Sequence, residues 1–179
     1  MKRMVVKSIM ALFLIANGLL FSYIYFVNTC MEMSQTMEYV AVEPKISLEY
    51  EPYSTDMTRA EIRERMEDIV GVFLYDERFE AIADKGNANT FSRVIRINKD
   101  IEITDYIWVL CHEMVHLKYY SHCERFTSYK TFVLLYNSEF RPMAINLACS
   151  MRDGGFEQEY NCYAQIEEYL INRGYPVNI

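Results

Sequence analysis

Two histidines and a glutamate near the middle of the chain have the types and spacing of a zinc hydrolase site. The run His112-Glu113-Met114-Val115-His116 has the form H-E-x-x-H. On a helix, residues four apart share a face, so both imidazoles can bind one metal ion. Glu113 is the next residue after His112 round the helix, where its side chain can reach a metal-bound water but cannot easily bind the metal itself. Zinc lowers the pKa of such a water to about 7, so Glu113 is predicted to be the general base.

The residues around the motif indicate a buried helix. Ile107, Val109 and Leu110 precede it, and Val115 and Leu117 lie within and after it. Polar side chains inside an apolar helix need partners. This setting favours a metal site over the alternative, a pair of histidines that are merely hydrogen-bonded in the core.

The patterns on either side of the motif predict an α+β domain over residues 57–179. Thr58-Arg59-Ala60-Glu61 is a capping box that starts an amphipathic helix. Asp84–Asn89 is typical of a turn between two short strands, which predicts a short antiparallel sheet. The predicted strands span 79–83 and 91–98, and the predicted helices after them span 107–120, 124–136, Pro142 to Gly154, and 156–172.

This arrangement resembles the gluzincin-type zinc metallopeptidases, specifically at H-E-x-x-H and more generally from about Phe91 to Leu170. The resemblance implies a zincin-like fold, one zinc ion and hydrolysis of peptide bonds. It also implies a strand beside the active-site helix that pairs with an extended substrate, and Val94–Asn98 is placed to be that strand. A third zinc ligand is implied as well, a glutamate from a later helix.

Two glutamates fit this third position. If 156–172 is one helix, Glu159 shares a face with Phe156 and Tyr163, whereas Glu157 lies on the wetter side. A ligand to a buried metal must face the core, so Glu159 is favoured over Glu157. His122 is a further alternative, with a solvated surface histidine as its simpler interpretation. The predicted metal ligands are therefore His112, His116 and Glu159, and no oxyanion-stabilising residue is chosen among Tyr119, Tyr120, Tyr160 and Tyr163.

Residues 1–30 are predicted to anchor the chain in a membrane. The stretch from Ile9 to Val27 is nearly all apolar, and its length matches a bilayer core of about 30 Å. No small-x-small pair follows it, which favours an uncleaved anchor over a signal peptide. Lys2, Arg3 and Lys7 should stay in the cytoplasm and leave the catalytic domain outside it. Residues 31–56 are predicted to be a stalk, since Pro44 and Pro52 interrupt them.

The composition restricts the partners. The net charge is −7, and the three basic residues at the N-terminus leave −10 for the rest of the chain, which disfavours a nucleic acid. We expect a peptide or protein substrate, with the lipid bilayer as the other partner. The alternatives are a membrane-tethered, non-catalytic binding protein and a zinc hydrolase of non-peptide amides. Cys111, Cys123, Cys149 and Cys162 could form two disulfides or be small buried hydrophobic residues.

Overall fold

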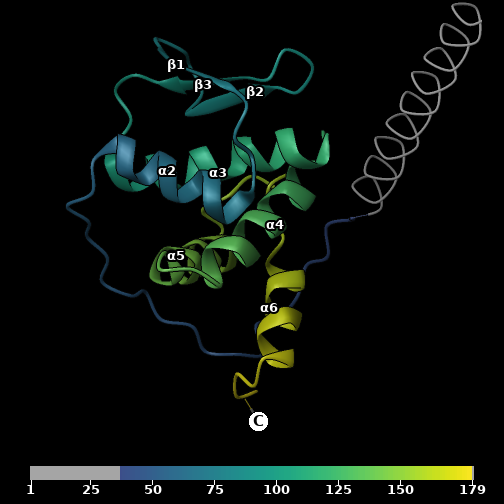
Figure 1. The fold of residues 1–179 in the computed structure, drawn as a ribbon. Coiled ribbons are helices and arrows are strands. Elements are labelled where there is room, and N and C mark those ends of the chain that lie inside the picture. The colour runs from purple at the N-terminus through teal and green to yellow at the C-terminus, as the bar shows by residue number, and fades with distance from the viewer. Residues whose placement is uncertain (1–36, 179) are drawn as a thin grey trace, which may run out of the picture.

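The fold places a small sheet over two helices, with three further helices on the far side of that pair (Figure 1). The computed structural model describes residues 37–178. They form five helices and one three-stranded sheet, so the predicted α+β class is confirmed. In chain order the elements are α2 (Arg59–Val70), β1 (Asp76–Glu80), β2 (Gly86–Asn89), β3 (Val94–Asn98), α3 (Ile103–Tyr119), α4 (Glu124–Tyr136), α5 (Arg141–Arg152) and α6 (Tyr163–Asn172).

Helix α2 begins where its sequence predicts. Thr58 and Glu61 form the complete capping box, in which each side chain accepts from the other residue's backbone N–H. Ile62, Met66 and Val70 are buried against α3. Gly71 ends the helix in the left-handed region, with φ 74°, where a glycine carries no steric penalty. The ammonium of Lys118 from α3 donates to the carbonyl of Val70, which holds the end of α2 onto α3.

The sheet is mixed, and in this respect the prediction of an antiparallel sheet is wrong. Its strand order is β1-β3-β2, with β1 parallel and β2 antiparallel to β3. Strand β3 therefore lies in the centre, and Ile95 and Ile97 are fully buried beneath it. Most of the segment 84–89 predicted as a turn is strand β2, because pairing with β3 satisfies its backbone despite its lack of β-branched residues.

Helix α3 is buried around most of its circumference. Tyr106, Ile107 and every residue from Val109 to Leu117 are buried, as expected of a helix that is apolar on all sides. It starts at Ile103, earlier than predicted. It ends at Tyr119, and Tyr120 adopts a left-handed conformation with φ 51° that turns the chain sharply into α4.

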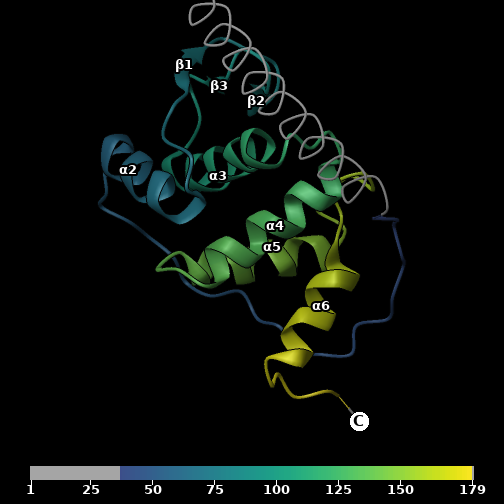
Figure 2. The ribbon, with the colours of Figure 1, turned by 45° about the vertical axis from the view of Figure 1, so that its right-hand side comes forward.

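Helices α4 and α5 lie side by side beneath α3, and α6 crosses below them (Figure 2). The bounds of α4 match the prediction, and Pro142 stands in the first turn of α5. The helix predicted to begin at Phe156 begins instead at Tyr163. A long loop, residues 153–162, thus replaces the first half of the predicted helix.

The segment before α2 belongs to the domain more closely than a stalk would. Residues 37–57 run past α6 and around the helices to α2, mostly without regular structure (Figure 1). Ile46 pairs with Val177 and is 1% exposed, and Leu48 is 5% exposed. The buried carboxylate of Glu167 on α6 accepts from the backbone N–H of Lys45 at 2.5 Å. We call residues 37–57 the arm; residues 31–36 of the predicted stalk lie outside the described residues.

The predicted membrane anchor, residues 1–30, also lies outside the described residues. Within 37–178, no helix combines the length and the apolar character that crossing a bilayer requires. Of the cysteines that the structure describes, Cys111, Cys149 and Cys162 are buried, and all four are unpaired.

Candidate metal centre

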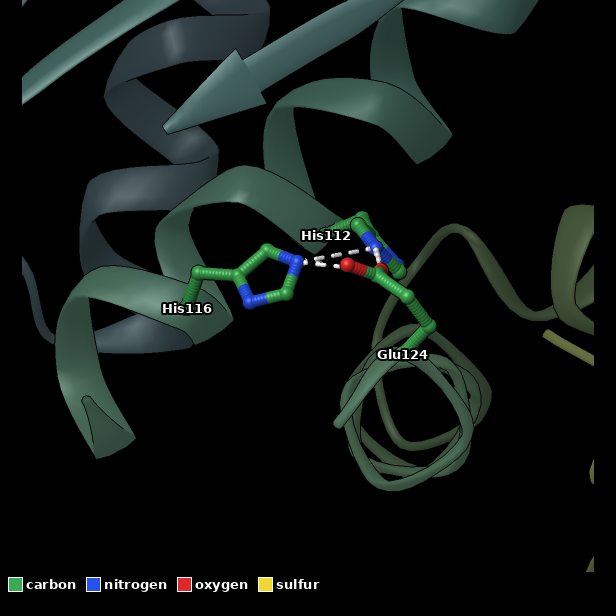
Figure 3. A group of neighbouring side chains, drawn as sticks. All are labelled: His112, His116 and Glu124. Atoms are coloured by element: carbon green, nitrogen blue, oxygen red, sulfur yellow. Dashed lines mark hydrogen bonds and ion pairs between the residues drawn. The ribbon is translucent and has the colours of Figure 1, made fainter. Parts of the chain in front are cut away.

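Three side chains from two helices converge on one point. His112 and His116 project from the same face of α3, and their Nε2 atoms are 3.2 Å apart. Glu124, the first residue of α4, faces them across the turn between the helices (Figure 3). Its Oε2 atom lies 2.9 Å from Nε2 of His112 and 3.2 Å from Nε2 of His116. The three residues form a group that could hold a metal ion.

The size of this triangle fits a tetrahedral zinc ion. Zinc binds histidine nitrogen and carboxylate oxygen at about 2.0–2.2 Å, so neighbouring tetrahedral ligands are about 3.3 Å apart. The observed edges of 2.9, 3.2 and 3.2 Å are close to that value. Two histidines and one carboxylate also make a usual donor set for catalytic zinc, which leaves a fourth position open to water or substrate. The residues present therefore fit the metal that the motif implies.

The ring of His116 is oriented by its other nitrogen. Its Nδ1 lies 2.7 Å from the backbone carbonyl of Ser121. A carbonyl can only accept, so Nδ1 carries the proton and donates it. In the neutral ring the lone pair is then on Nε2, which faces Glu124 and the shared point. The sharp turn at Tyr120 places the Ser121 carbonyl where this bond can form.

The ring of His112 is held differently. It packs against the indole of Trp108 one turn earlier on α3, with ring centroids 5.1 Å apart. Its Nδ1 is buried and has no hydrogen-bond partner among the described residues. Ring packing, rather than a hydrogen bond to Nδ1, therefore fixes the direction of its Nε2.

The charges at the centre favour an ionised Glu124. Burial raises the pKa of its carboxyl, but the hydrogen bonds to His112 and His116 outweigh burial and lower the pKa to about 2. Burial lowers the pKa of His112, despite its bond to Glu124. The pKa of His116 is raised: burial opposes the charged ring, but Glu124 and Glu113 together outweigh it.

Glu113 is buried beside this group, directly beneath the sheet. It is 6% exposed, and burial raises its pKa to about 7. Strand β2 crosses close above it: a β-carbon at Gly86 would lie 3.2 Å from Glu113 Oε1 and only 2.5 Å from Val109 Cγ1. Glycine at this position therefore allows β2 and α3 to approach, and the approach shields Glu113 from bulk water.

The group opens into a cleft of about 960 Å³. Helix α3 supplies Trp108, Val109 and Glu113, and the chain around β2 supplies one wall from Asp84 to Ala88. The opposite wall consists of residues from α5, the 153–162 loop and the arm: Met143, Asn146, Leu147, Ser150, Gly155, Phe156, Glu157, Tyr160 and Tyr53. Helix α3, which carries His112 and His116, is thus accessible from the cleft.

The strand that faces this cleft is β2, not the predicted strand Val94–Asn98. That segment is β3, whose two edges are already paired with β1 and β2. In the described chain β2 pairs with β3 alone and is an edge strand. The Asn98 N–H donates to the Lys85 carbonyl at 2.9 Å, so these two residues form a hydrogen-bonded pair of the antiparallel ladder. In such a ladder, hydrogen-bonded pairs alternate with pairs whose backbone groups point away from the partner strand. The backbone groups of Gly86 and Ala88 therefore point away from β3, along the cleft side of the strand.

The predicted site residues divide into two sets. His112, Glu113 and His116 come together as expected, with Glu113 beside the two histidines. Glu159 lies on an exposed turn and does not belong to the ligand group found among residues 37–178. The helix on which the choice of Glu159 rested is missing there, because α6 begins only at Tyr163. Glu157 and His122 line the cleft without joining the group.

Tyr160 is the candidate tyrosine that the structure brings to the centre. It lines the cleft, and its ring centroid is 6.2 Å from that of His112. Burial, together with Glu124 and Glu159, raises the pKa of Tyr160 to about 12, so its hydroxyl stays protonated. By contrast, Tyr163 is buried against Glu167, and Tyr119 packs on Phe126.

No protein-family model, curated protein or solved structure matches this chain. Sequence reasoning missed Glu124, although a signal was present: a helix predicted to begin at residue 124, only a few residues after His116, must start next to the end of the helix that carries the H-E-x-x-H motif.

Proposed function

We propose that this protein is a zinc-dependent metallopeptidase. The observation that carries the proposal is the convergence of His112, His116 and Glu124 on one point in an open cleft, with the buried carboxyl of Glu113 next to them. A structural zinc site is usually closed by four protein ligands and needs no base. Three ligands, an open side and an adjacent carboxylate are the arrangement of a hydrolytic site.

The types of the three donor atoms favour zinc as the metal. Two neutral imidazoles and one carboxylate suit zinc better than calcium or magnesium, which take mainly oxygen ligands. When bound, zinc supplies an activated water at neutral pH and polarises a carbonyl group. Each remaining task in amide hydrolysis falls to side chains or backbone groups of this chain.

The residues around the ligands divide those tasks. Glu113 accepts a proton from the attacking water and returns it to the leaving amine. The hydroxyl of Tyr160 donates a hydrogen bond to the oxyanion that forms at the carbonyl carbon. The backbone groups of Gly86 and Ala88 pair with an extended peptide laid along the cleft, as an exposed sheet edge commonly does. This last feature favours a peptide over a small amide.

The gluzincin resemblance belongs to this proposal, with one departure. The acid that faces the histidines, Glu124, comes from the helix directly after the active-site helix rather than from a later one. The ligand types are those of the gluzincins, but their order along the chain is more compact. We accordingly propose a small gluzincin-like site, anchored to a membrane by residues 1–30 with the catalytic domain outside the cytoplasm.

Metal binding by paired variants tests the ligand set. Glu124→Gln is expected to lower zinc affinity by at least about 10-fold, because it removes a ligand and not merely an outer contact, and outer contacts already account for 10- to 100-fold. Glu159→Gln removes the same charge from the exposed 153–162 loop and should bind one zinc ion like the parent. Dialysis against a competing chelator, followed by metal analysis, measures both. Loss of zinc in Glu159→Gln with retention in Glu124→Gln would reverse the assignment.

Catalysis is tested separately with Glu113→Gln. This variant should bind zinc with the parent's stoichiometry and fail to cleave a peptide library that the parent digests. If parent and variant both bind zinc and neither cleaves any peptide, the domain is a metal-dependent binding protein. Cleavage of small amides but of no peptide would instead indicate a non-peptide amidase.

A further inference from the structure

The 153–162 loop between α5 and α6 forms a wall of the metal cleft without regular structure of its own. It places Phe156, Glu157 and Tyr160 along the cleft. Internal bonds hold part of it, since the carbonyl of Glu157 accepts from the N–H groups of Tyr160 and Asn161. Further bonds tie it to α5, from the N–H of Gly155 to the carbonyl of Ser150 and from the side-chain amide of Asn161 to the carbonyl of Met151, and none of these bonds spans the distance between the loop and the histidines. That distance decides whether the Tyr160 hydroxyl can serve the metal centre.

Arg125 supplies the link between this loop and the metal ligands. It follows Glu124 directly on α4, and its guanidinium reaches across to the loop. Nε donates to the carbonyl of Asn161 at 3.0 Å, and Nη2 donates to the carbonyl of Gln158 at 2.7 Å. These two carbonyls lie on either side of Tyr160 in the sequence. Among the described residues, no other side chain from outside the loop hydrogen-bonds to its backbone.

The same guanidinium also holds the arm. Its Nη1 donates to the carbonyl of Met37 at 2.8 Å, and its Cζ lies 5.6 Å from the ring centre of Tyr39. One side chain thus makes three charge-assisted hydrogen bonds to two segments that are far apart in the sequence. A planar guanidinium with donors on several sides can do this, whereas the point charge of lysine cannot.

We propose that Arg125 is a positioning residue, which clamps the 153–162 loop and the arm together and so sets Tyr160 against the metal centre. Its effect on the cleft follows from the contacts alone, and its effect on turnover rests on the proposed peptidase function. Because the arm leads to the predicted membrane anchor, the clamp also ties the anchored end of the domain to the wall of the cleft.

Trp108 allows the clamp to be tested without catalysis. It is the only tryptophan of the chain and lines the cleft, with its ring centroid 6.1 Å from that of Phe156 on the loop. In the full-length chain, Arg125→Met should release the loop, so that the Trp108 emission shifts to the red and acrylamide quenching increases. Arg125→Lys keeps the positive charge but loses the planar guanidinium with its several donors. It should therefore also shift the Trp108 emission to the red and increase acrylamide quenching. Parent-like emission and quenching in either folded variant would overturn the clamp.

Arg59→Met is the matched control. Arg59 also donates to backbone carbonyls, those of Lys99 and Ile101, and its Cζ lies 4.7 Å above the ring of Phe79. It does not line the cleft. The control therefore loses a similar set of contacts elsewhere and should leave the Trp108 signal unchanged. An equal change in Arg59→Met would mean that the signal reports general loosening, which would also overturn the proposal.

Turnover supplies a second, independent measurement. Tyr160→Phe should lower kcat by about 100-fold if it removes an oxyanion donor, and Arg125→Met should lower kcat roughly 10- to 100-fold by misplacing it. In the Tyr160→Phe background, Arg125→Met should cost less than about 2-fold, because it acts through Tyr160. Full additivity would overturn the positioning role. If the parent cleaves no peptide, the proposed function fails, while the fluorescence comparison still decides whether the clamp exists.

Discussion

Replacement of Gly86 by alanine tests the close approach of β2 to α3. A β-carbon at this position would lie 2.5 Å from Val109 Cγ1. Carbon atoms pack at about 3.5–4.0 Å, so strand and helix would have to separate by about 1 Å. Overpacking of this kind costs roughly 1–3 kcal/mol. Gly86 is not among the glycines with positive φ, so the substitution adds no backbone strain that could be confused with the clash.

The cost of the clash can be isolated by removing its other partner. Val109→Ala deletes Cγ1, and in that background Gly86→Ala should destabilise the protein less, by about 1 kcal/mol or more. Urea denaturation of the parent, both single variants and the double variant gives this coupling energy. The single Gly86→Ala variant should also lose peptide turnover, because the outward shift of β2 moves the sheet edge away from Glu113. A parent-like stability, or an equal cost in both backgrounds, would refute the packing argument.

Three further predictions concern the elements that support the site. Ile46→Ala should cost about 2–5 kcal/mol in unfolding free energy because Ile46 is 1% exposed, whereas Val40→Ala, 53% exposed, should stay within about 0.5 kcal/mol; equal effects would place the arm outside the core. Thr58→Ala should lower the unfolding free energy by about 1 kcal/mol through loss of the capping box, and an unchanged urea midpoint would contradict this. Burial raises the pKa of Glu77 above its ordinary 4.5, against the opposing effects of Tyr106 and Arg63, so the folded state holds this proton more tightly than the unfolded state. Stability relative to Glu77→Gln should therefore fall as the pH rises above about 4.5, and a pH-independent difference between the two proteins would contradict the assignment.

The helices with strong local signals were predictable from the sequence. The capping box fixes the start of α2. The apolar residues around His112 and His116 correctly indicate a buried helix, because a long apolar segment is stable only when neighbours cover it on all sides. The motif inside that helix then follows from periodicity alone, since residues four apart must share a face.

Strand β2 could not be predicted in the same way. Its residues, Gly86 to Asn89, have low intrinsic strand preference and are typical of turns. They form a strand because their backbone groups pair with those of β3, and because Gly86, which has no side chain, can pack closely against α3. Both contacts depend on the final packing rather than on the residues of β2 themselves. The segment with the stronger strand pattern, Val94–Asn98, lies instead in the centre of the sheet.

The position of the acid beside the two histidines follows from chain connectivity rather than from helical periodicity. The periodicity argument for Glu159 required a continuous helix from Phe156, and the structure has a loop there. Chain connectivity is a stronger constraint. His116 lies in the last turn of α3, and only residues 120–123 separate this helix from α4. A connection that short keeps the two helix ends together, so an acid in the first turn of α4 must lie close to the histidines. Glu124 satisfies this condition, and the bond from His116 to the Ser121 carbonyl shows that the same short turn also orients the ring of His116.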